Sequence, residues 1–300
     1  MRALKLIAAA LLVGCVGFAG FVLVQVRAFD ASVAQDYGVA PVGVSRSSDP
    51  AVLARGEHLA RSYGGCVSCH GADLGGGEPE EMGPVGTFVG PNLTTGEGGV
   101  GSAYDAEAMA RAVAHGVGAD GRALLFMPSH DFAWWPRDDL EAVASYVLAA
   151  SPVDRAVASS EVGALGKVLD RFDAVPLVAA RRIDHAAPRP ETLEATPTAQ
   201  YGEKLAAVCT GCHGAGLSGG PLPGAPPDLP VPPNLTPHAS GLADWSEADF
   251  RRLLDEGTKP DGSALDPFMP REPYAAMSEV EKAALWAYLR SLPPTVAGGR

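Results

Sequence analysis

The sequence predicts an all-α protein in which two tandem helical domains follow one apolar N-terminal helix. Three observations lead to this prediction. The pattern C-x-x-C-H occurs twice, at residues 66–70 and 209–213. The residues around each copy recur in the same order, about 142 residues apart, which is typical of a domain duplication and not of a solenoid. An uninterrupted apolar run, residues 6–24, precedes both copies.

The apolar run is long enough to cross a bilayer as a helix. Arg2 and Lys5 lie on its short N-terminal side, which predicts that the N-terminus stays cytoplasmic. We therefore expect residues 1–27 to anchor the chain in a bacterial inner membrane, with the remainder in the periplasm. A cleaved signal segment is the alternative, although no convincing A-x-A cleavage site follows the run.

The rest of the chain divides into a tether (28–48), a first domain (49–152), a linker (153–197) and a second domain (198–300). The tether has no periodic pattern, and the linker contains no cysteine and several prolines. Capping residues mark the starts of four expected helices: Asp49 and Asp105 in the first domain, and Ser246 and Ser278 in the second. Two more helices are expected to begin at Pro136 and at about Thr198. Glycines mark the ends of two of them, at Gly116 and Gly257.

The repeated C-x-x-C-H motif predicts two covalently bound haem c groups. Two thiols one helical turn apart can each form a thioether to the porphyrin, and the adjoining histidine can bind the iron. A zinc site or a redox dithiol also uses C-x-x-C. Zinc needs four ligands in one place, whereas here the two pairs lie in copies of one pattern, and a dithiol needs no following histidine. The predicted attachment and proximal residues are Cys66, Cys69, His70, Cys209, Cys212 and His213.

Two methionines are the candidates for the second axial ligand of each iron. Met127 and Met269 occupy matching places in the two copies, each between a phenylalanine and a proline. A methionine more often fills a core than binds a metal, but the repeat places these two at equivalent positions, each beside a predicted haem. His130 is the rival ligand in the first domain.

Composition limits the partners. The net charge of −12 argues against nucleic acid, whose phosphates would repel the chain. It suits a redox protein with a basic docking face, although a solvated acidic surface without a partner explains it equally well. The fifth cysteine, Cys15, lies in the apolar run; residues 12–15 resemble a lipoprotein processing site, but the run continues beyond them.

Both copies resemble class I c-type cytochrome domains, over residues 50–152 and 198–294. The resemblance implies that the proline carbonyl of each P-N-L segment accepts a hydrogen bond from the proximal imidazole, and that the leucine covers the haem. It also implies an aromatic pattern on the C-terminal helix beside the haem. The haem-environment residues expected on this basis are Pro91, Leu93, Tyr146, Pro233, Leu235 and Trp286. Together the copies look most like cytochrome c subunits of membrane-bound periplasmic dehydrogenases.

The expected function is relay of single electrons between a donor and an acceptor at the membrane. One alternative is a subunit of a respiratory dehydrogenase or haem–copper oxidase complex, with the apolar helix as its assembly element. The other is a di-haem peroxidase, which needs an iron with a missing or displaceable distal ligand. Paired methionines argue against that enzyme.

Overall fold

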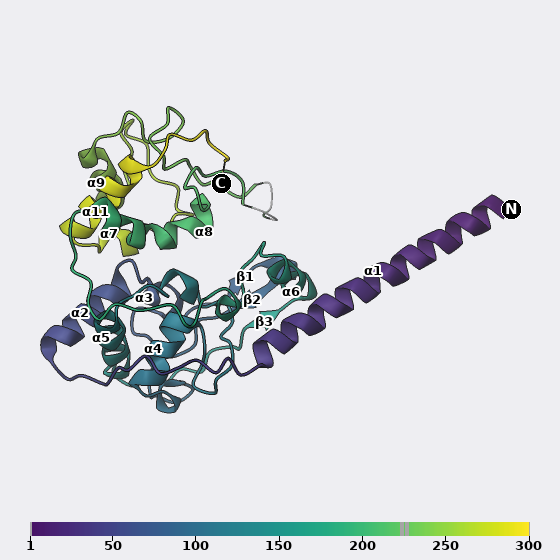
Figure 1. Ribbon diagram of the computed structural model, residues 1–300, viewed down its shortest axis with the longest axis horizontal. Helices are drawn as coiled ribbons and strands as arrows, with labels where there is room; N and C mark the ends of the chain where they lie inside the picture. The colour runs from purple at the N-terminus through teal and green to yellow at the C-terminus, as the bar shows by residue number, and fades with distance from the viewer. Residues whose placement is uncertain (1, 223–224, 226–227, 300) are drawn as a thin grey trace.

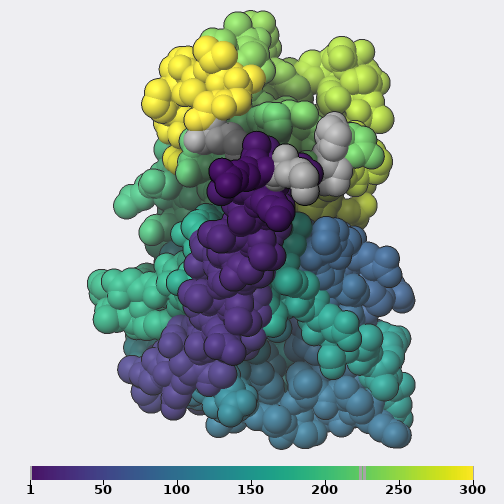
Figure 2. Space-filling model, turned by 90° about the vertical axis from the view of Figure 1, so that its right-hand side faces the viewer, coloured from purple at the N-terminus to yellow at the C-terminus, as the bar shows by residue number. Residues whose placement is uncertain are grey.

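The computed structural model describes residues 2–222, 225 and 228–299. The outermost residues of the expected domain ranges, 1 and 300, lie outside this part. Two mostly helical domains lie side by side, and a long helix, α1 (Arg2–Ala34), projects away from them (Figure 1). The most apolar window of α1 has a mean hydropathy of 2.6, and none of it is buried against the rest of the chain. Figure 2 shows α1 nearly end-on, in front of the two domains.

Domain 1 contains four helices, and three of them begin where the local sequence predicts. The Asp49 carboxylate accepts a hydrogen bond from Ala51 N–H, and Asp105 accepts one from Ala108 N–H, so both act as N-caps. Gly116 ends its helix with a left-handed φ of 64°. The helices are α2 (Pro50–Arg61), α3 (Cys66–His70), α4 (Ala106–His115) and α5 (Arg137–Leu148).

Domain 2 repeats this arrangement. Ser246 with Asp249, and Ser278 with Glu281, form complete capping boxes at the starts of two helices. The helices are α7 (Ala199–Leu205), α8 (Thr210–His213), α9 (Glu247–Glu256), α10 (Arg271–Ala275) and α11 (Glu279–Ser291). Short 3-10 turns complete the described helical structure: η1 (Gly83–Val85), η2 (Gly101–Ala103), η3 (Ser129–Asp131), η4 (Ala179–Arg181) and η5 (Ala206–Cys209).

One close helix crossing organises each domain, and a glycine makes it possible. In domain 1, α2 packs on α5, and a Cβ placed on Gly56 would lie 2.0 Å from the carbonyl oxygen of Ala142. In domain 2, α7 packs on α11, and a Cβ on Gly202 would lie 1.9 Å from the carbonyl oxygen of Ala284. Any other side chain would push the two helices apart at these positions.

A small antiparallel sheet interrupts the helical fold. Its strands follow the order β1 (Glu80–Glu81), β2 (Gly86–Phe88) and β3 (Glu161–Val162). Strands of two or three residues are too short to give a period-2 pattern in the sequence. The third strand belongs to the linker, which the sheet therefore ties to domain 1.

The segment 28–48, expected to be a tether, packs against both domain 1 and the linker. α1 continues to Ala34, and the Phe29 side chain is 2% exposed in a core cluster with Leu177 and Val178 of the linker. Further along, the Glu107 carboxylate of α4 accepts hydrogen bonds from three consecutive backbone N–H groups, residues 42–44. These contacts were not visible in the sequence because they come from residues distant in the chain.

The linker also lies on domain 1. Its helix α6 (Ala164–Arg171) packs against α1, and a later stretch pairs with the start of α5. There, Arg137 N–H donates to the Pro190 carbonyl and Asp138 N–H donates to the Glu191 carbonyl, both at 3.0 Å. Domain 1 is therefore wrapped by chain from outside the repeat.

The two domains meet at a buried carboxylate. The side chain of Glu281, on α11, is 1% exposed, and its two oxygens lie 3.0 and 2.9 Å from His58 Nε2 on α2. Arg55 lies 3.6 Å from the same carboxylate and forms a closer pair, at 2.8 and 2.9 Å, with Asp139 of its own domain. This cluster fixes how α2 of one domain meets α11 of the other.

Candidate haem-binding sites

The first predicted proximal ligand is oriented by a hydrogen bond from its ring. His70 ends α3, is 9% exposed, and its Nδ1 lies 2.9 Å from the Pro91 carbonyl oxygen. A carbonyl can only accept, so Nδ1 carries the proton and Nε2 carries the lone pair. Burial lowers the pKa of His70 and outweighs the opposing effect of the carbonyl, which keeps the ring neutral. A neutral imidazole with its lone pair on Nε2 is the form that binds iron.

The second copy has the same geometry. His213 ends α8, is 4% exposed, and its Nδ1 lies 2.8 Å from the Pro233 carbonyl oxygen. The residue before Pro233 is a proline, where the first copy has a glycine, yet the carbonyl occupies the equivalent place. Both proximal histidines are thus held in the same tautomer.

The cysteines suit covalent attachment better than thiol redox chemistry. Within the described residues none of them forms a disulfide. Burial raises the pKa of Cys66 and of Cys209 to about 12, so neither sulfur is a ready thiolate. The described part of the chain gathers no group of three His, Cys, Asp or Glu side chains that could hold a metal ion.

The two methionine loops have equivalent backbones. An isolated β-bridge precedes each methionine, Val117 with Ala123 and Thr258 with Ala264. Equivalent backbone bonds of 2.7 Å also tie each loop to the glycine that ends the preceding helix. Met127 and Met269 are both half-buried. Met109 and Met277 are 4% exposed in the core, as expected of filler.

His130 stays a rival to Met127. It follows in η3, and its Nδ1 is buried with no hydrogen-bond partner in the structure. Burial, and then the nearby Arg182, lower its pKa, so the ring is neutral and able to bind a metal. The choice between these two side chains remains a prediction for the first domain.

Sequence analysis missed the polar residues of the P-N-L-T segments. Asn92 is fully buried; its side-chain N–H2 donates to the Val153 carbonyl at 2.7 Å, and its Oδ1 accepts from Thr94 N–H at 2.9 Å. In the second copy Asn234 bonds the Thr295 carbonyl at 2.7 Å. These bonds hold the proline carbonyl loop against the chain that leaves each C-terminal helix. The recurrence of all four residues in both copies was the available signal.

The deciding observation is a match to known sequences: residues 53–151 and 199–293 each match the Cytochrome c family. The chain belongs to the cytochrome c family. Two cytochrome c domains, each normally binding haem c covalently, account for both C-x-x-C-H motifs and both imidazole–carbonyl hydrogen bonds.

Curated relatives include cytochrome subunits of dehydrogenases. The fructose dehydrogenase cytochrome subunit of Gluconobacter japonicus is 25% identical over 274 residues, which are 83% of this chain and 54% of that protein. The diheme cytochrome c-type protein of Cereibacter sphaeroides is 33% identical over 112 residues, 33% of this chain and 38% of that protein. The gluconate 2-dehydrogenase cytochrome c subunit of Pantoea cypripedii is 37% identical over 95 residues, 29% and 21% respectively. The matched regions thus cover about half or less of these relatives.

Further features of the cytochrome c domains are compatible with a bound haem. Leu93 and Leu235 pack on the buried core. In domain 1, Trp135 is 1% exposed, and its indole N–H has no partner, like that of neighbouring Trp134. Both belong to the core that includes Met127. An unpaired buried donor is costly, and a haem brings propionate oxygens that can accept such bonds.

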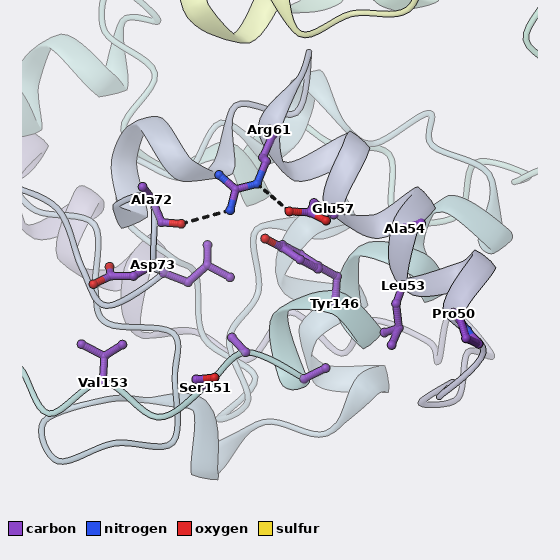
Figure 3. Close-up of a pocket in the computed structure, with 13 residues that line it drawn as sticks. Pro50, Leu53, Ala54, Glu57, Arg61, Ala72, Asp73, Tyr146, Ser151 and Val153 are labelled. Carbon is purple, nitrogen blue, oxygen red and sulfur yellow. Dashed lines mark hydrogen bonds and ion pairs between the residues drawn. The ribbon is translucent and has the colours of Figure 1, made fainter.

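The aromatic residues expected beside the haems lie on the C-terminal helices. Trp286 of α11 packs on Phe250, with ring centroids 5.5 Å apart, and the Arg290 guanidinium lies over its ring. Tyr146 of α5 lines an open groove of about 620 Å3 between α2 and the end of α5, beside Arg61 and Glu57 (Figure 3). None of the predicted iron ligands lines this groove. A haem contact of Tyr146 or Trp286 stays a prediction.

Proposed function

We propose that this cytochrome relays single electrons between a donor and an acceptor at the periplasmic face of the membrane. The observation that carries the proposal is the exact repetition of the site: each domain holds one histidine on a proline carbonyl and presents one methionine from an equivalent loop. When bound, each haem supplies a one-electron iron couple. Protein ligands on both sides of an iron leave no position for peroxide, which disfavours the peroxidase alternative.

Each residue has one role in this proposal. Four thiols, those of Cys66, Cys69, Cys209 and Cys212, form the thioethers. The Nε2 atoms of His70 and His213 would bind the irons, while Pro91 and Pro233 hold the rings and strengthen them as ligands. The sulfurs of Met127 and Met269 would be the second protein ligands, and would raise the potentials relative to a second histidine.

A redox titration followed by absorption spectroscopy tests this assignment. The holoprotein is expected to show two one-electron steps and the weak far-red band of sulfur bound to ferric haem. Met127→Ala and Met269→Ala should each remove about half of that band, and the core variant Met277→Leu should remove none. If His130→Ala changes the redox potential and the spectrum of the domain 1 haem and Met127→Ala does not, His130 is the ligand. Peroxide turnover by the unmodified protein would contradict the relay.

In this proposal the cytochrome is the electron-transfer subunit of a periplasmic dehydrogenase. Its support is the presence of such subunits among the relatives, one of them aligned over 83% of this chain. Extraction of the membranes with mild detergent, followed by sizing and mass spectrometry, is expected to recover the cytochrome with a dehydrogenase. Migration as a lone polypeptide would contradict this setting and leave the relay itself intact.

The N-terminal helix is retained as the anchor, with its N-terminus in the cytoplasm. The supporting observation is Phe29, because cleavage near residue 30 would remove a side chain that is 2% exposed in a hydrophobic cluster with Leu177 and Val178 of the linker. Burial of an aromatic side chain stabilises a fold by about 1.5–3 kcal/mol. The intact mass of the mature protein should include residues 2–30, and a start near residue 30 would contradict the anchor.

A further inference from the structure

The linker helix α6 runs antiparallel to the end of α1. Lys167 of α6 binds the Asp30 carboxylate at 2.6 Å, and its ammonium lies 5.7 Å from the centre of the Phe29 ring. Five residues later, the Phe172 ring stacks on Phe21 with centroids 6.0 Å apart. The contacts move toward the N-terminus of α1 as α6 proceeds. The far end of α6 therefore points along α1 toward its apolar run (Figure 1).

The position of Phe21 in the apolar run indicates how deep the C-terminal end of α6 lies relative to the membrane. Phe21 lies inside the apolar run 6–24, before the first polar residues at Gln25 and Arg27. A helix rises 1.5 Å per residue, so Phe21 is about 6 Å deeper than Gln25. When α1 spans the bilayer, the ring stacked on Phe21 is therefore at the boundary of the hydrocarbon region.

The side of α6 toward the protein is fixed, and its opposite side is apolar and exposed. A Cβ on Gly166 would lie 2.2 Å from the Val85 carbonyl oxygen, so α6 is seated tightly on domain 1. Asp170 is fully buried and accepts N–H bonds from Leu177 and Val178 at 2.9 and 3.0 Å. On the outer side, Leu165 is 44% and Phe172 60% exposed.

We propose that the end of α6 is a second membrane contact, in which Phe172 inserts into the outer leaflet beside α1. The occupant is lipid and not another protein, because the exposed ring is continuous with a helix surface that is itself uncovered over the apolar run. The adjacent Asp173 suits the headgroup region because Arg182 neutralises its charge at 2.6 Å. Since α6 is seated on domain 1, this contact sets the height and tilt of domain 1 over the membrane.

The inference rests on the proposed retention of α1, and the test separates the two. The full-length holoprotein, with Cys15→Ser, is placed in vesicles of phosphatidylethanolamine and phosphatidylglycerol with both haems oxidised. A nitroxide is attached in turn to Phe172→Cys, to Phe21→Cys in the span, and to Ala51→Cys on the exposed start of α2. Collisions with dioxygen, which concentrates in lipid, are compared with collisions with a water-soluble nickel chelate.

The label at 172 is expected to resemble the label at 21, with a ratio of dioxygen to nickel collisions several-fold above that at 51. If the label at 172 matches the one at 51 while the label at 21 is in lipid, the anchor stands and the contact is wrong. If the label at 172 is shielded from both reagents, protein covers it and the lipid assignment is overturned. If the label at 21 is itself in water, α1 does not span and the inference fails with the anchor.

Discussion

The two cytochrome c domains share one scaffold but differ in what surrounds it. In domain 1, Phe126 N–H donates to the Leu177 carbonyl of the linker at 2.7 Å, and its ring stacks on Phe88 at 4.3 Å. In domain 2, the equivalent Phe268 N–H is bonded to Asp266 of its own loop, and its side chain is 43% exposed. The repeat therefore specifies the haem site, while chain outside the repeat encloses domain 1 and connects it to α1.

The largest loss of stability is expected at the helix crossings, which the two domains share. Gly56→Val and Gly202→Val each place side-chain atoms within about 2 Å of a helix carbonyl across the crossing. We expect each to lower the free energy of unfolding by about 3 kcal/mol or more. Thermal unfolding followed by far-ultraviolet circular dichroism measures this, and Gly17→Ala in α1, which meets no atom within 4 Å, is the control. Tolerance of valine in one domain would show that its helices cross differently.

The contact between the domains should give the next effect. Glu281→Gln removes the buried charge that His58 and Arg55 of domain 1 share, and is expected to cost about 2 kcal/mol. Asp139→Asn at the equivalent position removes a pair that lies within domain 1. The first variant should separate the unfolding of the two domains into two calorimetric transitions, while the second should not. Coincident transitions in both variants would mean that other contacts join the domains.

The same carboxylate gives a pH dependence with a definite sign. Burial opposes its ionisation, but the hydrogen bonds from His58 and Ser278 N–H and the charge of Arg55 outweigh burial, so the pKa of Glu281 lies below its ordinary 4.5. Its contribution to stability is therefore complete above pH 4.5 and is lost as the pH falls through the lowered pKa. Acid titration of stability should be shallower over that range in Glu281→Gln than in the unmodified protein.

The parts of this comparison that the sequence predicted are local or repeated. The caps at Asp49, Asp105, Ser246 and Ser278 needed only neighbouring residues, and all four helices begin as expected. The cysteines and histidines stood out because they recur. Their assignment as haem residues depends on the motif, since spacing alone does not distinguish one cofactor from another.

The parts that the sequence did not predict depend on distant contacts. Nothing near residues 42–44 indicates that Glu107 will hold their N–H groups, and nothing near Arg55 indicates a carboxylate from the other domain. The unpaired indole N–H groups of Trp134 and Trp135 are visible only once burial is known. Enclosure of domain 1 is therefore a tertiary property that no periodic pattern encodes.

A smaller loss of stability is expected when the buried asparagine of either domain is removed, because each asparagine bonds a different segment of backbone. Asn92→Ala releases the linker carbonyl of Val153, and Asn234→Ala releases the carbonyl of Thr295 near the C-terminus. Each leaves buried groups unpaired, at a cost of about 1–2 kcal/mol. Hydrogen exchange should accelerate in residues 153–157 for the first variant and in residues 295–299 for the second. Faster exchange at both places in either variant would mean that the two clamps are coupled.

The smallest effect is expected at the groove of domain 1. Arg61 bonds Glu57 one turn earlier at 2.9 Å, with both side chains largely in water (Figure 3). Glu57→Gln should cost no more than about 0.5 kcal/mol because solvent screens the pair. The matched change in α9 of domain 2, Glu247→Gln, removes a similar pair to Arg251, which keeps a second partner in Glu279. Urea unfolding at low and high salt should show both effects shrinking as salt rises. If Glu57→Gln lowered the free energy of unfolding much more than Glu247→Gln, and did so at any salt concentration, Glu57 would do more than pair with Arg61.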